Sequence, residues 1–560
     1  MLSLEEARRL CHALTQGFSQ REARLRELSR WICPSRGIFT RRNEDSPKRP
    51  DMLRFTQPAA QAVLRGASGM TSGITPSGTP WFRPGFTNPE LEELSQARPW
   101  LDQVDRTMKD CLGGGGFYQA IQSFNTDLIW AGSALLYSEA SAINALRYEC
   151  IQQGTWAVAT DREGQLQSVC RSLCLGATDV LPIAGEEARL SPGTRRLLKM
   201  HSTEKIGVWH LSLTDTDGPY PVESCWWEEG GKEFLSQSGY EEMPFFFTVW
   251  HEGATVYGTG PGDEALPDAM QMDLLERRKL EGLAKIISPP VSAPTQLKGY
   301  VDLSPGAINF TPDRSLISPI LDLGSFAMSL PHIRQEIETV QARLNRSLMA
   351  DIFTSMPLDQ RPAGMSATEF LERKREALQQ LGPVISAYEP NVLTPLLFRT
   401  LQALNRMGSL PPIPDALRQY DLDVKIDFIS PSSNALRQTG AETTRALFRD
   451  VAQMVQASGD ASVLDKIDMD QMVDELASGL GCPGKIVRAD AEVEALRQQR
   501  AQAQQQAQAM QMQAQQLANM QGQAQALMAQ ANAAKAMNEA GQDAPDDGAI
   551  NVLGELGLEA

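Results

Sequence analysis

The side chains best suited to catalysis are few in this 560-residue chain and form no catalytic pattern. The sequence contains no H-E-x-x-H zinc-protease motif and no G-x-S-x-G nucleophile elbow. The acidic residues are numerous but spread along the chain, so no carboxylate pair stands out. The five histidines also lie apart: His12, His201, His210, His251 and His332. These observations favour a structural or interaction protein over an enzyme, and no cofactor is expected.

The eight cysteines give no metal-binding pattern either. Only Cys170 and Cys174 lie close together in the sequence, and they lack the second pair and the nearby histidine that a zinc site needs. We therefore expect all cysteines to be reduced, as in a cytoplasmic protein.

Two glycine-rich stretches are poor candidates for phosphate binding. The run at residues 113–116 is followed by no Lys-Ser/Thr pair and preceded by no strand pattern, so a flexible connector is favoured. The G-x-G at residues 258–260 has no βαβ context and is interpreted as a turn.

Charge limits the kind of nucleic-acid contact available. The net charge is −17, which argues against a protein that grips nucleic acid through a basic surface. An acidic wall does permit DNA to slide past, because it repels phosphate. The polar loop at residues 34–50 could touch nucleic acid, although a solvated loop is the favoured interpretation. Its basic residues are Arg36, Arg41, Arg42, Lys48 and Arg49.

Neither a membrane span nor a secretion signal is expected. No uninterrupted apolar run approaches the length that crosses a bilayer. The N-terminus, MLSLEEARRL, contains acidic residues and no apolar signal core.

The elements that must position any site are mainly helical in the first 131 residues and strand-rich in the next 110 or so. Ser3 and Glu6 form a capping box for a helix that continues to Trp31. Further helices are predicted at residues 57–72, 88–112 and 117–131, and a turn at residues 75–82 delivers Trp81 and Phe82 to a core. Short strands are then predicted at residues 155–160, 206–212, 224–227 and 245–250, with helical turns near 177–181 and 195–201.

The strongest helical signal comes from two long amphipathic segments. The first is predicted at residues 268–287, with Asp268 as N-cap and an apolar face of Leu280, Leu283, Ala284 and Ile287. The second is predicted at residues 331–352, with apolar residues at steps of three and four: Ile333, Ile337, Val340, Leu344, Leu348 and Ile352. Their similar lengths suggest an antiparallel pair that carries the irregular segment 291–325 as a small module at its tip.

The second long helix is followed by a loop and further short elements. Two prolines and a glycine exclude a helix at residues 353–365. A capped helix restarts at Ser366, helices are predicted at residues 392–407, 442–457 and 469–480, and residues 422–428 alternate as a half-buried strand.

The last region has a distinct composition. Residues 491–540 are rich in Gln, Ala and Met, and their apolar residues fit heptad positions that Arg500 and Gln521 interrupt. This stripe is too small and polar for a strong lone dimer and suits many copies packed around an axis. A partly ordered low-complexity tail is the alternative. Residues 541–560 are expected to be disordered.

The order of these parts resembles the portal, or head-to-tail connector, proteins of short-tailed phages. The resemblance covers roughly residues 4–520. It depends on the 57–72 helix with Thr75-Pro76 and Trp81-Phe82, on the block from Phe117-Tyr118 through residues 132–137, and on Tyr257-Gly258-Thr259-Gly260 before a long helix. A helix, a clip, a second helix, a loop and a capped helix follow in the order of a portal core.

The resemblance implies an α+β, mainly helical portal fold with defined parts. Residues 1–267 would be the N-terminal wing, 268–287 and 331–352 the two stem helices, 288–330 a small β-containing clip, and 353–366 the channel loop. Residues 367–487 would form the C-terminal wing or crown, 488–540 the crown or barrel helix, and 541–560 a disordered tail. Within the channel loop, Asp359, Gln360 and Arg361 would lie nearest the DNA.

The resemblance also implies function and partners. The protein would form a homo-oligomeric ring, usually a dodecamer, at one capsid vertex of the virion after assembly in the host cytoplasm. Double-stranded DNA would pass through it during packaging and ejection. Its protein partners would be the major capsid protein, the scaffold protein, the terminase and a tail adaptor, with no membrane involved. The competing hypothesis is a cytoplasmic scaffold or adaptor that oligomerises through the C-terminal coiled coil.

Overall fold

The computed structural model describes most of the chain as two compact units. Unit 1 spans Met1–Pro483 and unit 2 spans Gly484–Ala560. The described residues are 2–36, 56–88, 91, 94, 96–214, 218–287, 291–292, 318–319, 323–351, 382–415, 417–420, 423–429, 449–451, 453, 470–473 and 490–540. The described residues form long helices and four sheets, which confirms the expected mixed, mainly helical class.

The N-terminal helix α1 is as the sequence predicts. It runs Leu4–Trp31, and the Ser3 hydroxyl accepts from the Glu6 N–H while the Glu6 carboxylate accepts from the Ser3 N–H. Its two ends belong to different hydrophobic clusters. Ala7 and Cys11 pack against the five-stranded sheet described below, whereas Leu25 and Leu28 belong to the largest core.

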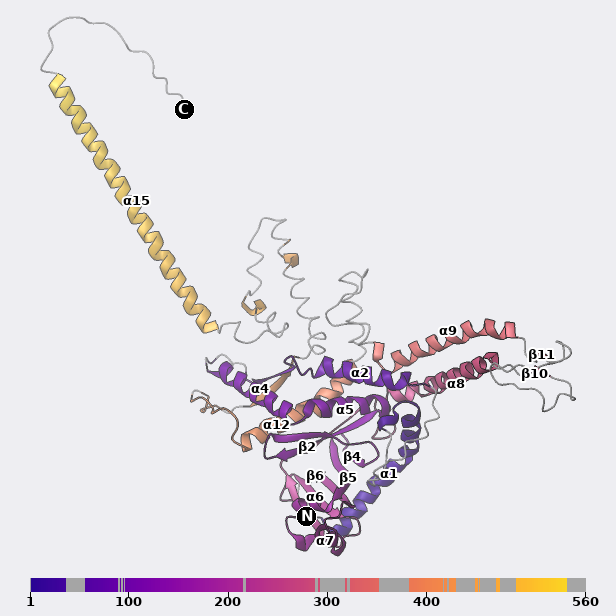
Figure 1. Ribbon diagram of the computed structural model, residues 1–560. Helices are drawn as coiled ribbons and strands as arrows, with labels where there is room; N and C mark the ends of the chain where they lie inside the picture. The colour runs from indigo at the N-terminus through magenta and orange to yellow at the C-terminus, as the bar shows by residue number, and fades with distance from the viewer. Residues whose placement is uncertain are drawn as a thin grey trace. The chain divides into compact units, whose positions relative to one another are not determined.

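The largest core lies around helices α2 (Pro58–Ile74), α4 (Ala97–Gly114) and α5 (Phe117–Ala131), seen beside strand β2 in Figure 1. The predictions for α2 and α5 are confirmed, and Trp81 and Phe82 are fully buried in this core as expected. The predicted start of α4 at Asn88 is wrong. Helix α4 begins at Ala97, and before it the N–H groups of Leu91, Leu94 and Ala97 each donate to the carbonyl three residues earlier. Pro99 has no N–H to donate into a helix that begins earlier.

Two antiparallel sheets form the middle of unit 1. A three-stranded sheet has the order β3 (Ala145–Cys150), β2 (Ser133–Ser141), β9 (Phe245–Val249). A five-stranded sheet has the order β4 (Trp156–Thr160), β5 (Leu166–Gly176), β6 (Lys205–Thr214), β7 (Val222–Glu228), β8 (Phe234–Tyr240). The four strands predicted here are confirmed, as are the short helices, observed as α6 (Ala177–Ala184) and α7 (Pro192–Lys199).

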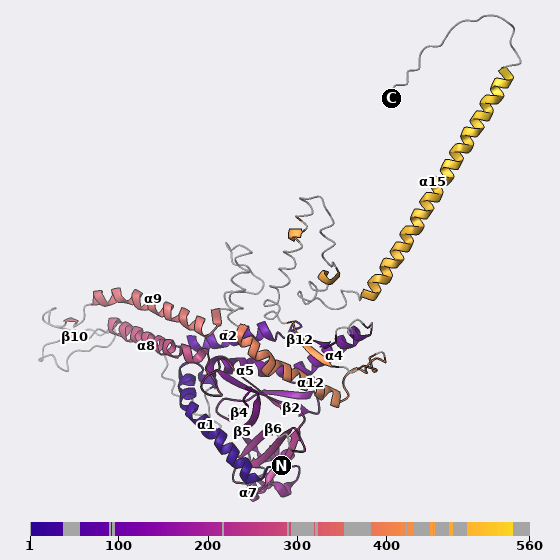
Figure 2. The same cartoon turned by 180° about the vertical axis from the view of Figure 1, so that it is seen from behind.

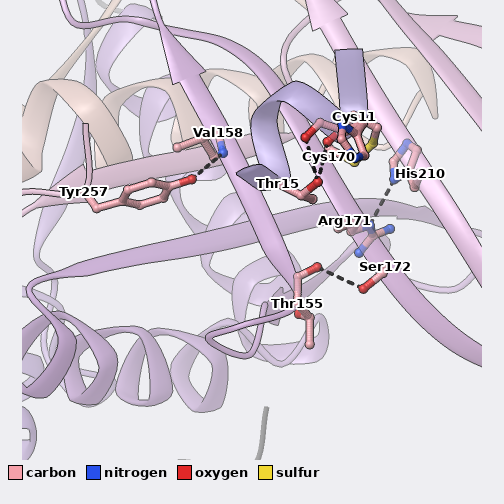
Figure 3. The surroundings of a disulfide bond; sticks show 10 residues. Cys11, Thr15, Thr155, Val158, Cys170, Arg171, Ser172, His210 and Tyr257 are labelled. Carbon is pink, nitrogen blue, oxygen red and sulfur yellow. Dashed lines mark hydrogen bonds between the residues drawn. A yellow bond between two sulfur atoms is a disulfide. The ribbon is translucent and has the colours of Figure 1, made fainter. Parts of the chain in front are cut away.

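The two faces of the five-stranded sheet are chemically different. On one face Cys170, Leu211 and Cys225 lie in cross-strand register under α1. On the other face the buried Arg171 donates to the Nδ1 atom of His210 at 2.9 Å, as Figure 3 shows. Burial and the nearby Arg171 charge hold the pKa of His210 well below its usual value, so the imidazole stays neutral.

Two segments that are distant in the sequence pair with each other in unit 1. Strand β1 (Phe82–Phe86) pairs antiparallel with β12 (Val424–Phe428), which confirms the alternating strand predicted there. Before it, helix α12 (Thr394–Arg406) is continuous with helical residues 382–388 through a π-helical turn at Glu389–Leu393. The predicted start of that helix at Val392 is therefore wrong.

Arg36, predicted as part of a solvated basic loop, instead pairs with a buried carboxylate. Its guanidinium forms two bonds, at 2.7 and 2.5 Å, to the fully buried carboxylate of Asp127 in α5. Trp130 donates to the same carboxylate at 2.8 Å. Arg36 thus anchors the start of the loop, because a buried carboxylate needs a charged partner. The rest of that loop lies outside the described residues.

The expectation that all cysteines are reduced is wrong for one pair. Cys11 of α1 and Cys170 of β5 form a disulfide bond, drawn in Figure 3. The two cysteines are 159 residues apart in the sequence, so spacing gave no sign of the pairing. Only the packing of α1 on the sheet brings them together. The other described cysteines are free: Cys33, Cys111, Cys150, Cys174 and Cys225.

Candidate functional site: the two-helix hairpin and its base

Two long helices of unit 1 lie side by side and project away from the sheets in both views (Figures 1 and 2). Helix α8 runs Pro261–Ile287 and helix α9 runs Leu323–Ser347. Near their far end, β10 (Val291–Ser292) pairs antiparallel with β11 (Ser318–Pro319). The predicted antiparallel pair is therefore present, and we call α8 and α9 the hairpin. Of the segment predicted at its tip, the structure describes the β10–β11 pair and the start of α9, and the rest lies outside the described residues.

The predicted helix bounds in the hairpin need correction. Helix α8 begins seven residues before Asp268, because the Asp263 carboxylate accepts from the Gly260 N–H at 2.8 Å and so caps the helix there. Asp268 instead pairs across the hairpin with Arg343 at 3.2 Å. Helix α9 also begins earlier than Pro331, and it ends at Ser347 because Met349 has a left-handed backbone, with φ of 60°.

The base of the hairpin is held by contact between backbones. Gly132, at the turn from α5 to β2, has a φ of 78°, and a Cβ atom there would lie 2.6 Å from the Gly260 nitrogen. A Cβ atom on Gly262 would overlap the Trp130 carbonyl oxygen. Only glycine permits this approach at both places. The start of α8 is thereby fixed directly onto the end of α5.

Helix α1 also binds the base. Arg24 pairs with Asp263 at 2.5 Å, and Arg21 donates to the Ser133 hydroxyl at 2.8 Å and to the Tyr257 carbonyl at 3.1 Å. Burial lowers the pKa of Arg21 to about 10, with the Asp263 charge opposing that shift. The guanidinium remains charged at neutral pH, so the capping residue of α8 faces two cations from α1.

The half of the hairpin near its base is an apolar two-helix contact. Four residues of the predicted stripe are buried: Ile337, Val340, Leu344 and Leu348. Ile333 is half-buried against the same core, and Ile352 lies outside the described residues. The four buried residues belong to one core with Ala265, Ala269 and Met272 of α8. Gly66 of α2 permits the end of this stripe to dock, because a Cβ atom there would lie 2.6 Å from the Leu348 carbonyl oxygen.

The far half of α8 exposes the apolar face that the sequence predicts. Leu280, Leu283 and Ile287 are 46%, 37% and 75% exposed. Solvent contact of large apolar side chains is unfavourable by about 25 cal/mol per Å². Among the described residues, these three side chains therefore form an exposed apolar surface.

Charged residues border this apolar surface. Glu281 accepts from Arg277 at 3.0 Å and from Arg278 at 2.9 Å, while Lys279 pairs with Glu276 at 2.5 Å. These bonds to Arg277 and Arg278 lower the pKa of Glu281. Over the whole of α8 six acidic residues outnumber four basic ones, so the helix carries no surplus of positive charge.

Unit 2 contains one long described helix, α15 (Asp490–Ala540), of 51 residues. The prediction of a helix at residues 491–540 is confirmed. Its side chains over residues 497–536 are exposed, including Met510, Leu517 and Met528, whereas Val493 and Leu496 are half-buried. From Ala501 to Ala534 the sequence contains no Asp, Glu, Lys or Arg. The helix thus offers a long, uncharged and partly apolar surface.

The predicted channel-loop residues Asp359, Gln360 and Arg361 lie outside the described residues, as does most of the segment predicted as a clip. Sequence reasoning missed Asp263 and the glycines at the base of the hairpin. Their signal was the Gly258–Gly262 cluster, which was interpreted only as a turn. Within the described ranges no group of His, Cys, Asp and Glu side chains could hold a metal ion. Among the same residues no helix is both long and apolar enough for a membrane span.

The chain, which combines helices, sheets and a projecting hairpin, was compared with known proteins. The profile of a family described as bacteriophage head to tail connecting protein matches residues 4–487. The chain belongs to that family, which confirms the resemblance noted from the sequence.

Two relatives agree with this assignment. The chain is 28% identical over 495 residues to a probable portal protein of Bordetella phage BPP-1, a match that covers 85% of this chain and 87% of the relative. It is 26% identical over 525 residues to the portal protein of Salmonella phage epsilon15, covering 89% of this chain and 91% of the relative.

The base contact gives a direct prediction. Substituting Gly262→Ala should destabilise the attachment of α8 by about 1–3 kcal/mol, because the new methyl group overlaps the Trp130 carbonyl and the backbones must separate. Hydrogen exchange in the first turns of α8 should become faster and the thermal midpoint should fall. The matched control is Gly113→Ala in α4, where a Cβ atom meets nothing within 4 Å. Equal behaviour of the two variants would contradict the proposed contact.

Proposed function

We propose that this protein is a portal protein, which forms a ring-shaped channel at one vertex of a phage capsid. The observation that carries the proposal is the family match over residues 4–487, together with two relatives named as portal proteins that align over most of their length. DNA passes through the channel during packaging and ejection, and the ring attaches the tail. The role is structural rather than enzymatic.

The hairpin is proposed to be the stem of the ring. Helices α8 and α9 are 27 and 25 residues long, so the longer one extends about 40 Å at 1.5 Å per residue. In a ring each hairpin has two neighbours, and a heterologous contact repeated around an axis closes without leaving an unpaired surface. The exposed Leu280, Leu283 and Ile287 support this arrangement, since a neighbouring copy would bury them.

The remaining parts are assigned by the same proposal. Residues 288–330, which include the β10–β11 pair, form the clip that faces terminase and later the tail adaptor. Residues 1–267 and 367–487 form the wing and crown, which face capsid and scaffold proteins. Residues 353–366 form the channel loop, with Asp359, Gln360 and Arg361 nearest the DNA. Twelve subunits is the number we propose, with assembly in the host cytoplasm before incorporation into the virion.

The charge of the chain suits a channel for a moving polyanion. Each strong phosphate contact would add a salt-dependent attraction that slows passage. A net charge of −17 keeps such contacts few. The paired charges on α8 and the uncharged stretch of α15 support the same conclusion. Copies of α15 are proposed to pack around the ring axis as a barrel.

The alternative is a scaffold that oligomerises only through α15. Light scattering of the full chain and of a chain lacking residues 491–560 separates the two proposals. The portal proposal predicts a ring-sized mass for both, because the stem and wing hold the subunits together. A shortened chain with monomer mass would contradict it and favour the scaffold.

The stem surface gives a second prediction. The double substitution Leu280→Asp and Leu283→Asp should shift the mass of the full chain towards monomer, because a charge buried between neighbours is costly. Far-ultraviolet circular dichroism should stay unchanged, since both side chains are exposed in the single chain. The control is Ile143→Asp in the turn between β2 and β3, a side chain 85% exposed. If the double variant still forms rings as stable as the control, the stem is not the interface.

A further inference from the structure

A disulfide joins the N-terminal helix to the middle of the five-stranded sheet. The Cα atoms of Cys11 and Cys170 are 5.7 Å apart. The two side chains are 4% and 0% exposed and lie in a small apolar cluster with Leu211 and Trp227. Figure 3 shows the bond between α1 and β5, with the Thr15 hydroxyl donating back to the Cys11 carbonyl one turn away.

The Cys11–Cys170 bond fixes one end of α1, a helix that contributes to two separate hydrophobic clusters. The Cys11 end of α1 belongs to the cluster on the five-stranded sheet. The other end belongs to the core that also contains Ala265 and Ala269 of α8. Between them Arg21 and Arg24 bind the base of the hairpin. Fixing one end of α1 therefore restricts the position of the groups that hold the start of α8.

Apart from the disulfide, noncovalent contacts attach this end of α1 to the sheet. The Leu2 N–H donates to the Glu223 carboxylate at 3.1 Å, and Arg8 donates to the Gly231 carbonyl. Among the described residues, Ala7 and Cys11 are buried in the cluster, and the partly buried side chains that pack against it from this end are Leu2, Leu4, Leu10 and Leu14. Noncovalent contacts of this kind can open locally, whereas the disulfide fixes the helix to the sheet covalently.

We propose that Cys11 and Cys170 form a redox-sensitive crosslink, a dithiol in a reducing compartment and a disulfide outside it. In the dithiol state α1 opens from the sheet more readily, and in the disulfide state α1 is fixed between the sheet and the base of the hairpin. The change of compartment rests on the proposed function. A phage connector is made in bacterial cytoplasm, where thiols stay reduced, and it leaves the cell in the virion. The bond itself does not depend on that function.

The chemistry needs an external oxidant, for which we name a small-molecule disulfide such as oxidised glutathione. One cysteine thiolate attacks the oxidant and displaces one glutathione thiolate, which leaves a mixed disulfide. The second cysteine thiolate then attacks that mixed disulfide and displaces the other. Two protein thiols are oxidised to one disulfide, and one glutathione disulfide is reduced to two thiols. Because both sulfur atoms are buried, the first step occurs when α1 opens locally.

The chain offers a matched control. Cys174 lies on the same strand four residues after Cys170, is half-buried and is free. It belongs to none of the hydrophobic clusters formed by the described residues. Cys174→Ser removes a thiol from β5 without affecting the crosslink. Cys11→Ser removes the crosslink with the smallest change of side-chain volume.

The experiment uses the purified full-length chain, reduced with dithiothreitol or oxidised with glutathione disulfide. Alkylation followed by peptide mapping should find Cys11 and Cys170 joined only in the oxidised sample. Hydrogen exchange in residues 4–15 should slow about tenfold on oxidation, and exchange in the first turn of α8 should slow as well. The thermal midpoint should rise by about 5 °C. These differences should persist in Cys174→Ser and vanish in Cys11→Ser.

The proposal is overturned if both thiols remain free after oxidation, or if α1 exchanges equally fast in the two states of the wild-type chain. The wild-type comparison stands even where Cys11→Ser folds poorly. Ring formation is scored separately by light scattering. Loss of rings in every sample would reject the portal proposal while the mapping and exchange results still decide the crosslink.

Discussion

The structure depends on one close backbone contact, where the start of α8 meets the end of α5. Gly132, Gly260 and Gly262 remove the Cβ atoms that would separate the two chains, and Asp263 caps the helix that begins there. Helix α1 then binds the same carboxylate through Arg24. The contacts of α8 with the α5–β2 turn and with α1 lie at its base. The glycine contact therefore helps to set the direction of the hairpin, which is the part proposed as the stem.

The hairpin and the long C-terminal helix share a physical feature, which is apolar surface that the single chain does not bury. Near the base, Val340 and Leu344 are buried against α8, but Leu280 and Ile287 at the far half are exposed. In α15 the described side chains are exposed over residues 497–536, and a helix in a protein gains most of its stability from packing rather than from propensity. Both elements are therefore more stable in an assembly than alone. This agrees with a family of connecting proteins, and it explains why apolar residues persist in places where a monomer would favour polar ones.

Much of the fold could be predicted from local patterns, and what could not was determined by contacts between distant residues. The capping box at Ser3, the helix at residues 117–131 and the stripe at Val340 and Leu344 follow from short-range spacing. The end of α8 at Ile287 was predicted, but its start was not, because Asp263 rather than Asp268 caps it through a turn packed on Gly132. The ion pair between Arg36 and Asp127 spans 91 residues, and the disulfide spans 159; spacing carries no information at that range. Of the predicted site, the hairpin is present, whereas Asp359, Gln360 and Arg361 stay a prediction because they lie outside the described residues.

The central claim is that these hairpins stand side by side around an axis, and imaging the assembled protein tests it most directly. Electron cryomicroscopy of the purified full-length chain should show closed rings, with the hairpins of neighbouring copies in contact at Leu280 and Leu283 and a bore wide enough for duplex DNA. Particles in which each hairpin folds back against its own chain, or in which copies touch only through α15, would contradict the account.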